Sequence, residues 1–350
     1  MTNEAVYDAT TLGTPKMLVL GMQHLFAMFG ATVLVPAITG LNVSTTLLFA
    51  GLGTLLFHLI TGGKVPAFLG SSFAFIPSMC AAFAGSISMS LGYLGLLIGA
   101  AFAGLVYVII AAVVKFVGVA WINKLMPAAV IGPTVALIGL SLAGAAVNDV
   151  FSYGAKQDFG TSSYFIMTPA IWVSFICAMV TLFVVILCST YGKKAGKLFP
   201  FIFGILAGYA VAAIFTVCGV PVIDFSLFEN LKIVAVPEFS FMEAIKGVKD
   251  IDGSYIATVA VAYIPVAFVV FAEHIADHKN LSSIIDEDLL QDPGLHRTLL
   301  GDGVGSMVGA LFGGCPNTTY GESVGCVAIS GNASVVTILT TSILAMVASF

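Results

Sequence analysis

The sequence predicts an all-α protein that crosses a membrane several times. Of its 350 residues, 59% are hydrophobic and only 9% are charged, and the mean hydropathy is +1.07. Soluble domains carry about 25% charged residues, so this composition excludes a soluble enzyme. Apolar stretches close to the roughly 20 residues that a membrane-spanning helix needs recur along the chain. The predicted spans are 17–38, 43–61, 91–114, 126–147, 168–188, 198–219, 254–275, 295–313 and 333–350.

The first apolar run is expected to remain in the protein as a membrane helix. It is long, contains Gln23 and His24, and is followed at once by further spans, unlike a cleavable signal peptide. Orientation follows from the basic loop residues, because cytoplasmic loops carry the excess. A cytoplasmic N-terminus places Lys16, Lys64, Lys115, Lys124, Lys193, Lys194, Lys197, Lys279 and Arg297 inside, against Lys156, Lys232, Lys246 and Lys249 outside.

Two shorter apolar segments, 66–84 and 316–331, are interrupted by Gly and Pro. The first contains FLGSSFAFIP and the second CPNTTYGESVG, where small, polar and aromatic residues alternate. Such sequences favour a short extended stretch over a full helix. Non-helical backbone survives at membrane depth only where protein or a polar cavity satisfies its N–H and C=O groups. The alternative is that these clusters merely kink packed helices.

The two interrupted segments lie in two four-span blocks, about 14–115 and 254–350. Weak internal similarity relates the blocks: QHLFAMFGATVLVP opens the first, and VAFVVFAEHIADH occupies the matching place in the second. Paired broken helices in two repeats are typical of transporters, whose substrate site then lies near the membrane midplane.

Three carboxylates in apolar sequence, Glu273, Asp277 and Glu322, are the best indication of function, and Asp302 is a fourth intramembrane acid. An ionised carboxylate costs about 2.5–3.5 kcal/mol at the centre of a membrane helix, so each of the three is expected to serve a polar cargo. Glu273 and Asp277 are four residues apart and share a helix face, where they could carry a proton or accept hydrogen bonds. Structural alternatives are a solvated helix end for Asp277 and a first-turn helix acid for Glu322.

A metal site is not expected. His274 and His278 are four residues apart, but the zinc-protease pattern places its Glu between the histidines, whereas Glu273 precedes both. Asp302 has either a local structural role or a coupling role, and His58 is interpreted as a packed histidine. The cysteines lack paired spacing and are interpreted as small buried hydrophobes; they are Cys80, Cys177, Cys188, Cys218, Cys315 and Cys326.

The chain resembles the nucleobase–ascorbate transporter family from about Pro15 to its last residue. QHLFAMFGATVLVP, GSSFAF, AEHIADH, DPGLHR and NTTYGE match the family in order and spacing. The resemblance implies fourteen segments in two inverted sevenfold repeats, with short β-strands in segments 3 and 10. It divides the chain into core segments 1–4 (14–124), gate segments 5–7 (125–222), an outside loop (223–253) and core segments 8–11 (254–350). By the family pattern, the gate segments 12–14 would follow Phe350 and are missing here.

The resemblance also implies a substrate, uracil, and residues that bind it. Glu273 and Glu322 are expected to hydrogen-bond the ring, the backbone at Phe73 and Gly321 to contact its carbonyl oxygens, and Ala31 to line the pocket. Proton coupling is assigned to Glu273, Asp277 and Glu322. Supporting roles are assigned to Gln23, His24, Tyr320 and Asp302.

The implied function is proton-coupled uracil symport across the bacterial inner membrane, with H⁺ as the coupling ion and no cofactor. The implied partners are uracil, membrane lipid and a second copy of the chain, without nucleic acid. Ser323 and Ser330 replace the Asn and Thr of the family signature, which leaves substrate specificity open. The alternatives are a permease for a purine such as xanthine or urate, an anion transporter of the same fold, and a truncated nucleobase-binding membrane protein that does not transport.

Overall fold

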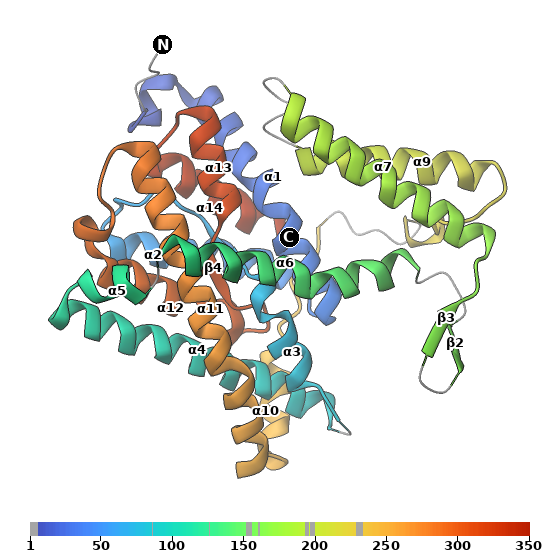
Figure 1. The fold of residues 1–350 in the computed structure, drawn as a ribbon, viewed down its shortest axis with the longest axis horizontal. Coiled ribbons are helices and arrows are strands. Elements are labelled where there is room, and N and C mark those ends of the chain that lie inside the picture. The colour runs from blue at the N-terminus through green and yellow to red at the C-terminus, as the bar shows by residue number, and fades with distance from the viewer. Residues whose placement is uncertain are drawn as a thin grey trace. The chain divides into compact units, whose positions relative to one another are not determined.

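The computed structural model describes residues 6–85, 87–125, 127–151, 156–159, 162–192, 196, 200–228 and 234–350. Four lysines of the orientation argument, Lys193, Lys194, Lys197 and Lys232, lie outside these residues. The chain forms two compact units (Figure 1). The first combines 1–136 with 234–350, and the second is 137–233. The first unit thus holds both stretches that the resemblance assigns to a core domain, and the division into core and gate stays a prediction.

The first unit is built mainly from long apolar helices, joined by shorter ones such as α5, and several of them begin and end at local signals in the sequence. Asn42, Ser88 and Asp252 each accept a backbone N–H of the first turn that follows, which satisfies a donor the helix itself cannot. Gly40 and Gly62 adopt the left-handed conformation that ends a helix. The helices are α1 (Thr14–Thr39), α2 (Val43–Thr61), α4 (Met89–Val117), α5 (Ala120–Leu125), α11 (Gly253–Ile285), α12 (Leu295–Leu311) and α14 (Val335–Ala348).

The two interrupted segments contain short strands, as predicted. In the first, β1 (Leu69–Ser71) is followed by a 3₁₀ turn at Phe73–Phe75 and by α3 (Ile76–Ala82). In the second, β4 (Asn317–Thr319) is followed by α13 (Gly321–Ser330). The strands pair antiparallel, with Gly70 opposite Thr318. Because each strand's backbone groups bond to the other strand, these segments are more than kinked helices.

Helix α12 lies between α2 and α4 and supports the strand pair. A Cβ at Gly303 would lie 2.7 Å from Tyr107 Cβ of α4, and one at Gly301 would lie 2.8 Å from the Phe57 ring of α2. Small residues let membrane helices approach closely where lipid provides no hydrophobic drive to associate. Segments far apart in the sequence meet in the same way: α14 packs on both α1 and α2 (Figure 1).

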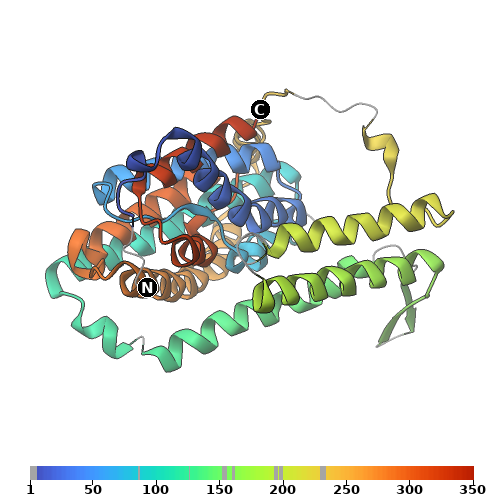
Figure 2. The ribbon, with the colours of Figure 1, turned by 90° about the horizontal axis from the view of Figure 1, so that it is seen from above.

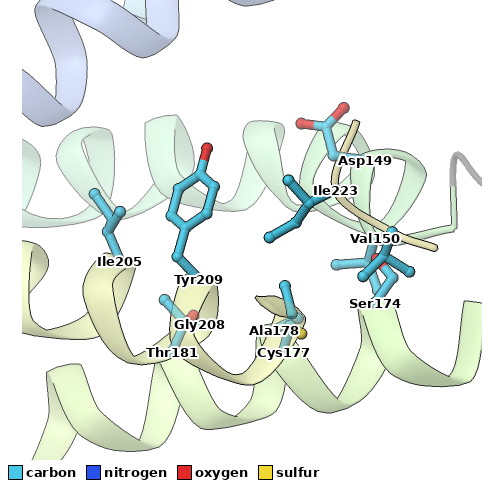
Figure 3. Close-up of a pocket in the computed structure, with 12 residues that line it drawn as sticks. Asp149, Val150, Ser174, Cys177, Ala178, Thr181, Ile205, Gly208, Tyr209 and Ile223 are labelled. Atoms are coloured by element: carbon cyan, nitrogen blue, oxygen red, sulfur yellow. The ribbon is translucent and has the colours of Figure 1, made fainter. Parts of the chain in front are cut away.

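The second unit contains the end of α6 (Ala128–Val150), α7 (Pro169–Tyr191) and α9 (Pro200–Val217). Helices α7 and α9 run side by side (Figure 2). A cavity of about 370 Å³ lies between these two helices and the end of α6. Most of its lining is apolar, and its polar residues are Asp149, Ser174, Thr181 and Tyr209 (Figure 3). The hairpin of β2 (Lys156–Phe159) and β3 (Ser162–Phe165) was not predicted. Its strands are too short to produce a clear alternating pattern.

Five helices in the described residues are long and apolar enough to cross a membrane: α1, α2, α4, α7 and α11. Shorter apolar helices lie at 73–82, 202–217 and 335–348. Helix α11 continues to Ile285, beyond the predicted end at 275, because it ends only where Asp286 adopts the left-handed conformation. The prediction of buried cysteines is wrong for Cys80 and Cys218, which are exposed. A small apolar side chain can face lipid as readily as protein.

Candidate functional site

Each short strand leads directly into the first turn of a helix. Ser72 precedes the turn at Phe73, and Tyr320 precedes α13, which begins at Gly321. The first N–H groups of a helix have no partner among the helix's own carbonyls. At the first of these turns the Ser72 hydroxyl accepts the Ala74 N–H at 3.3 Å, which leaves the N–H groups of Phe73 and Gly321 as the candidate donors to a ligand. Helix α11 packs against β4, α13 and the turn at Phe73–Phe75. The strands and α11 therefore bring the two broken helices and the acidic helix together.

The two carboxylates of α11 are held by different broken helices. Ser72 Oγ, directly after β1, donates to Glu273 Oε2 at 3.3 Å. Thr319 Oγ1, in β4, donates to Asp277 Oδ2 at 3.1 Å. Asp277 is only 7% exposed and lies two turns before the end of α11. The alternative that placed Asp277 at a solvated helix end is therefore wrong.

Glu322 completes a cluster of three carboxyl groups. It lies in the first turn of α13, is partly buried, and interacts electrostatically with Glu273 and Asp277. Gly321 brings the start of α13 close to the same cluster, since a Cβ there would lie 3.4 Å from Asp277 Oδ1. The cluster thus has acceptors from α11 and α13 beside the backbone N–H groups at the starts of the Phe73–Phe75 turn and of α13.

A second, fully buried network lies behind this cluster. Asp302 Oδ2 is 2.6 Å from His274 Nδ1 and accepts a hydrogen bond from Thr318 Oγ1 at 3.0 Å. His274 Nε2 lies 3.0 Å from Thr298 Oγ1. Asp302 is 0% exposed. Its contacts with His274 and Thr318 connect α12 to α11 and β4. Of the two roles left open for Asp302, this geometry favours positioning of the strand and the acidic helix.

The paired histidines of α11 interact with each other. Their ring centroids are 4.0 Å apart, and His278 Nδ1 donates to the carbonyl oxygen of His274 at 2.9 Å. Across the described residues, no cluster of three or more His, Cys, Asp or Glu side chains has the arrangement of a metal site.

Tyr320 locks β1 to α1. Its hydroxyl donates to the carbonyl oxygen of Ser71 at 3.0 Å and lies 2.7 Å from Thr32 Oγ1. Its ring crosses Gly70, where a Cβ would lie only 2.4 Å from a ring carbon, so this position needs a glycine. Ala31, next to Thr32, is buried, and Phe73 is half-buried. The predicted contacts of Ala31 and Phe73 with a ligand remain predictions.

Gln23 and His24 of α1 contact residues of α13 that follow Glu322. His24 Nδ1 lies 3.2 Å from Ser323 Oγ, which accepts the backbone N–H of Phe68 at 3.3 Å. Gln23 is buried and interacts with Cys326. Ser323, noted in the sequence only as a departure from a signature, therefore connects α1 and α13 to the segment that enters β1. Polar residues beside a broken helix were the available signal, because such backbone needs partners.

Known proteins resemble this chain over nearly its whole length. A family model described as the permease family matches residues 15–350. The chain belongs to this family. The permease is 39% identical to a uracil permease of Bacillus caldolyticus over 346 residues, which cover 99% of this chain and 73% of the relative. It is 38% identical to a uracil permease of Bacillus subtilis over 329 residues, which cover 94% of this chain and 70% of the relative.

A third relative is a uracil permease of Paenibacillus larvae, to which this permease is 37% identical over 331 residues, 95% of this chain and 72% of the relative. These findings confirm the family that the motifs indicated. The permease is a multi-pass membrane transporter and not an enzyme.

Proposed function

We propose that this permease imports uracil together with protons across the cytoplasmic membrane of a bacterium, with its N-terminus inside. The observation that carries the proposal is the cluster of Glu273, Asp277 and Glu322 beside two helix starts inside the membrane-spanning unit. The names of its relatives, uracil permeases at 37–39% identity, support the substrate.

The chemistry of the site suits a planar ring with both N–H donors and carbonyl acceptors. Glu273 and Glu322 can accept the ring N–H groups, and the first N–H groups at Phe73 and Gly321 can donate to ring carbonyls. A site that bonds each polar edge of its ligand discriminates strongly, because a poor ligand leaves buried groups unpaired. We therefore expect a preference for uracil over the larger purines.

Protons enter through the same carboxyl groups. Three carboxylates this close together inside a membrane are costly to hold fully ionised, so binding an uncharged ring favours a state in which the cluster carries a proton. Asp277, held by Thr319 beside the start of α13, is placed to share that proton. Uptake is then expected to rise as the external solution becomes more acidic. A homodimer through the gate helices is part of the same proposal.

The experiment is uptake of labelled uracil in cells lacking their own permease, at acidic and at neutral external pH, with unlabelled xanthine as competitor. We expect faster uracil uptake at acidic pH, and we expect xanthine to leave this uptake unchanged. Glu322→Gln should abolish uptake, whereas Glu287→Gln, the same change at an exposed loop acid, should have no effect.

Both variants must reach the membrane in equal amounts for the comparison to hold. Normal uptake by Glu322→Gln would contradict the proposed site. Competition by xanthine would favour a purine permease, and uracil binding without flux would favour a non-transporting binder.

A further inference from the structure

A groove separate from the carboxylate cluster lies in the first unit between α2, α4 and α12. Its volume is about 640 Å³. Most of the side chains that line it are apolar. Along α4 the small side chains of Ala111 and Ala112 leave the groove open. The other apolar lining residues are Leu59, Ile60, Val108 and Leu300.

One end of this groove is basic. Lys115 lies in the last turn of α4, and His296 and Arg297 lie in the first turn of α12. His296 interacts electrostatically with both neighbours, so the three groups form one cluster. This contrasts with the whole chain, whose formal net charge is −5.

The two permanent cations of the cluster are available to a ligand. Lys115 and Arg297 are exposed, and neither forms an ion pair or side-chain hydrogen bond with another described residue. No acidic residue is among those that line the groove in the described part of the chain. Asp292, five residues before Arg297, is bound to Lys64 at 2.6 Å.

The groove runs from helix ends into the apolar surface of the unit. It includes the last turns of α2 and α4 and the first turn of α12, and the predicted orientation places all three ends at the cytoplasmic face. Basic pockets between membrane helices at that face attract anionic lipid head groups. An acyl chain would cover the apolar wall below them.

We propose that this groove binds an anionic phospholipid. Its phosphate lies against Lys115 and Arg297, and one acyl chain follows Ala111, Ala112 and Leu300. A free phosphate fits less well, because two exposed cations hold a small anion weakly in salt. The apolar wall contributes only to a ligand that also carries a hydrocarbon chain.

The test is native mass spectrometry of the full chain, titrated with phosphatidylglycerol or phosphatidylcholine of identical acyl chains. We expect roughly thirtyfold more bound phosphatidylglycerol, since Lys115 and Arg297 each contribute about 1 kcal/mol of attraction near a membrane surface and about 1.4 kcal/mol corresponds to tenfold. Lys115→Gln with Arg297→Gln should bring the ratio close to one. Lys16→Gln with Lys124→Gln removes two exposed lysines outside the groove and should leave the preference intact.

A second variant keeps both cations and fills the groove. Ala112→Trp should lower phosphatidylglycerol binding although the charge is unchanged, and it tests the proposal even if the double Gln variant fails to fold. Inorganic phosphate should not displace the lipid.

Equal binding of the two lipids, or an equal loss in both double variants, would overturn the proposal in favour of general surface attraction. Displacement of the lipid by phosphate would make the groove a free anion site instead.

Discussion

Thr319 and Ser72 each donate to a carboxylate of α11, one from each broken helix. Neither hydroxyl stands out in the sequence, because Ser and Thr in membrane helices commonly bond their own backbone, as Thr258 does to Ser254. Glu273, Asp277 and Glu322 did stand out, since a carboxylate in an apolar span is rare. The acceptors of the site were therefore predictable, and their donors were not.

Replacing Thr319 by Val tests the donor to Asp277. The change keeps the shape of the side chain and leaves the carboxylate without this hydrogen bond, which costs about 1–3 kcal/mol where the group is buried. We expect uracil uptake to fall about tenfold and its pH dependence to shift, measured as initial rates over a range of external pH. Thr258→Val, on the exposed face of α11, is the matched control. An unchanged pH profile in Thr319→Val would separate Asp277 from proton coupling.

Asp302 is expected to act through folding. Asp302→Ala leaves His274 and Thr318 without their buried acceptor, at a cost of about 1–3 kcal/mol. The midpoint of thermal unfolding in detergent should fall, while Asp250→Ala, at an exposed acid, should leave it in place. If Asp302→Ala unfolds normally but no longer transports uracil, then Asp302 takes part in coupling.

At the scale of elements, helix α12 shows why close packing around the strand pair needs glycine. Its Gly303 meets Tyr107 and the backbone of Gly104 on α4. The sequence predicts a span over 295–313, but it does not say which face of α12 approaches another helix. Likewise, the broken helices were predictable from Pro and Gly, whereas the antiparallel register of β1 with β4 was not. Register depends on which partner the fold brings alongside.

Gly303→Ala should therefore destabilise the protein. The added Cβ would lie 2.7 Å from Tyr107 Cβ and 3.1 Å from a backbone oxygen, and overpacking of this kind costs about 1–3 kcal/mol. Gly30→Ala in α1 meets nothing within 4 Å and should be neutral or stabilising, because Ala favours a helix over Gly. Thermal unfolding of both variants measures the difference. Equal midpoints would show that α4 and α12 separate easily.

A loop element provides a pH effect distinct from transport. Lys246 and then Ser90 hydrogen-bond Glu243 of α10 (Phe241–Lys246) and hold the pKa of its carboxyl below the usual value of 4.5. A lowered pKa in the folded state means that these contacts stabilise above pH 4.5 and are lost as the pH falls through the folded value.

The midpoint of thermal unfolding of the wild type should therefore fall more steeply below pH 4.5 than that of Glu243→Gln. The two proteins should behave alike in uptake at milder acidity. A parallel decline of both would show that α10 does not depend on this carboxylate.

At the scale of the whole molecule, the orientation of the chain can be tested at Cys218. This cysteine is exposed just after α9, and a cytoplasmic N-terminus places it outside. In a Cys80→Ser background, a membrane-impermeant maleimide applied to intact cells should label the protein, and Cys218→Ser should remove the label. If the label reaches Cys218 only in broken cells, the chain has the opposite orientation.

Local composition and spacing determined much about this protein. They predicted a polytopic helical fold, two interrupted helices and three carboxylates with a polar role, and the resemblance of the motifs indicated the family. These features depend on residues close together in the chain and on the cost of placing charge in an apolar medium.

Only the tertiary structure decided how these parts combine. It placed Thr319 on Asp277, Ser72 on Glu273 and the Asp302 network behind them, and it grouped Lys115 with Arg297 in one groove. Each of these contacts joins residues separated by tens to hundreds of positions. Such contacts arise from close packing of helices and pairing of strands, and no local pattern specifies which distant partner a side chain will meet.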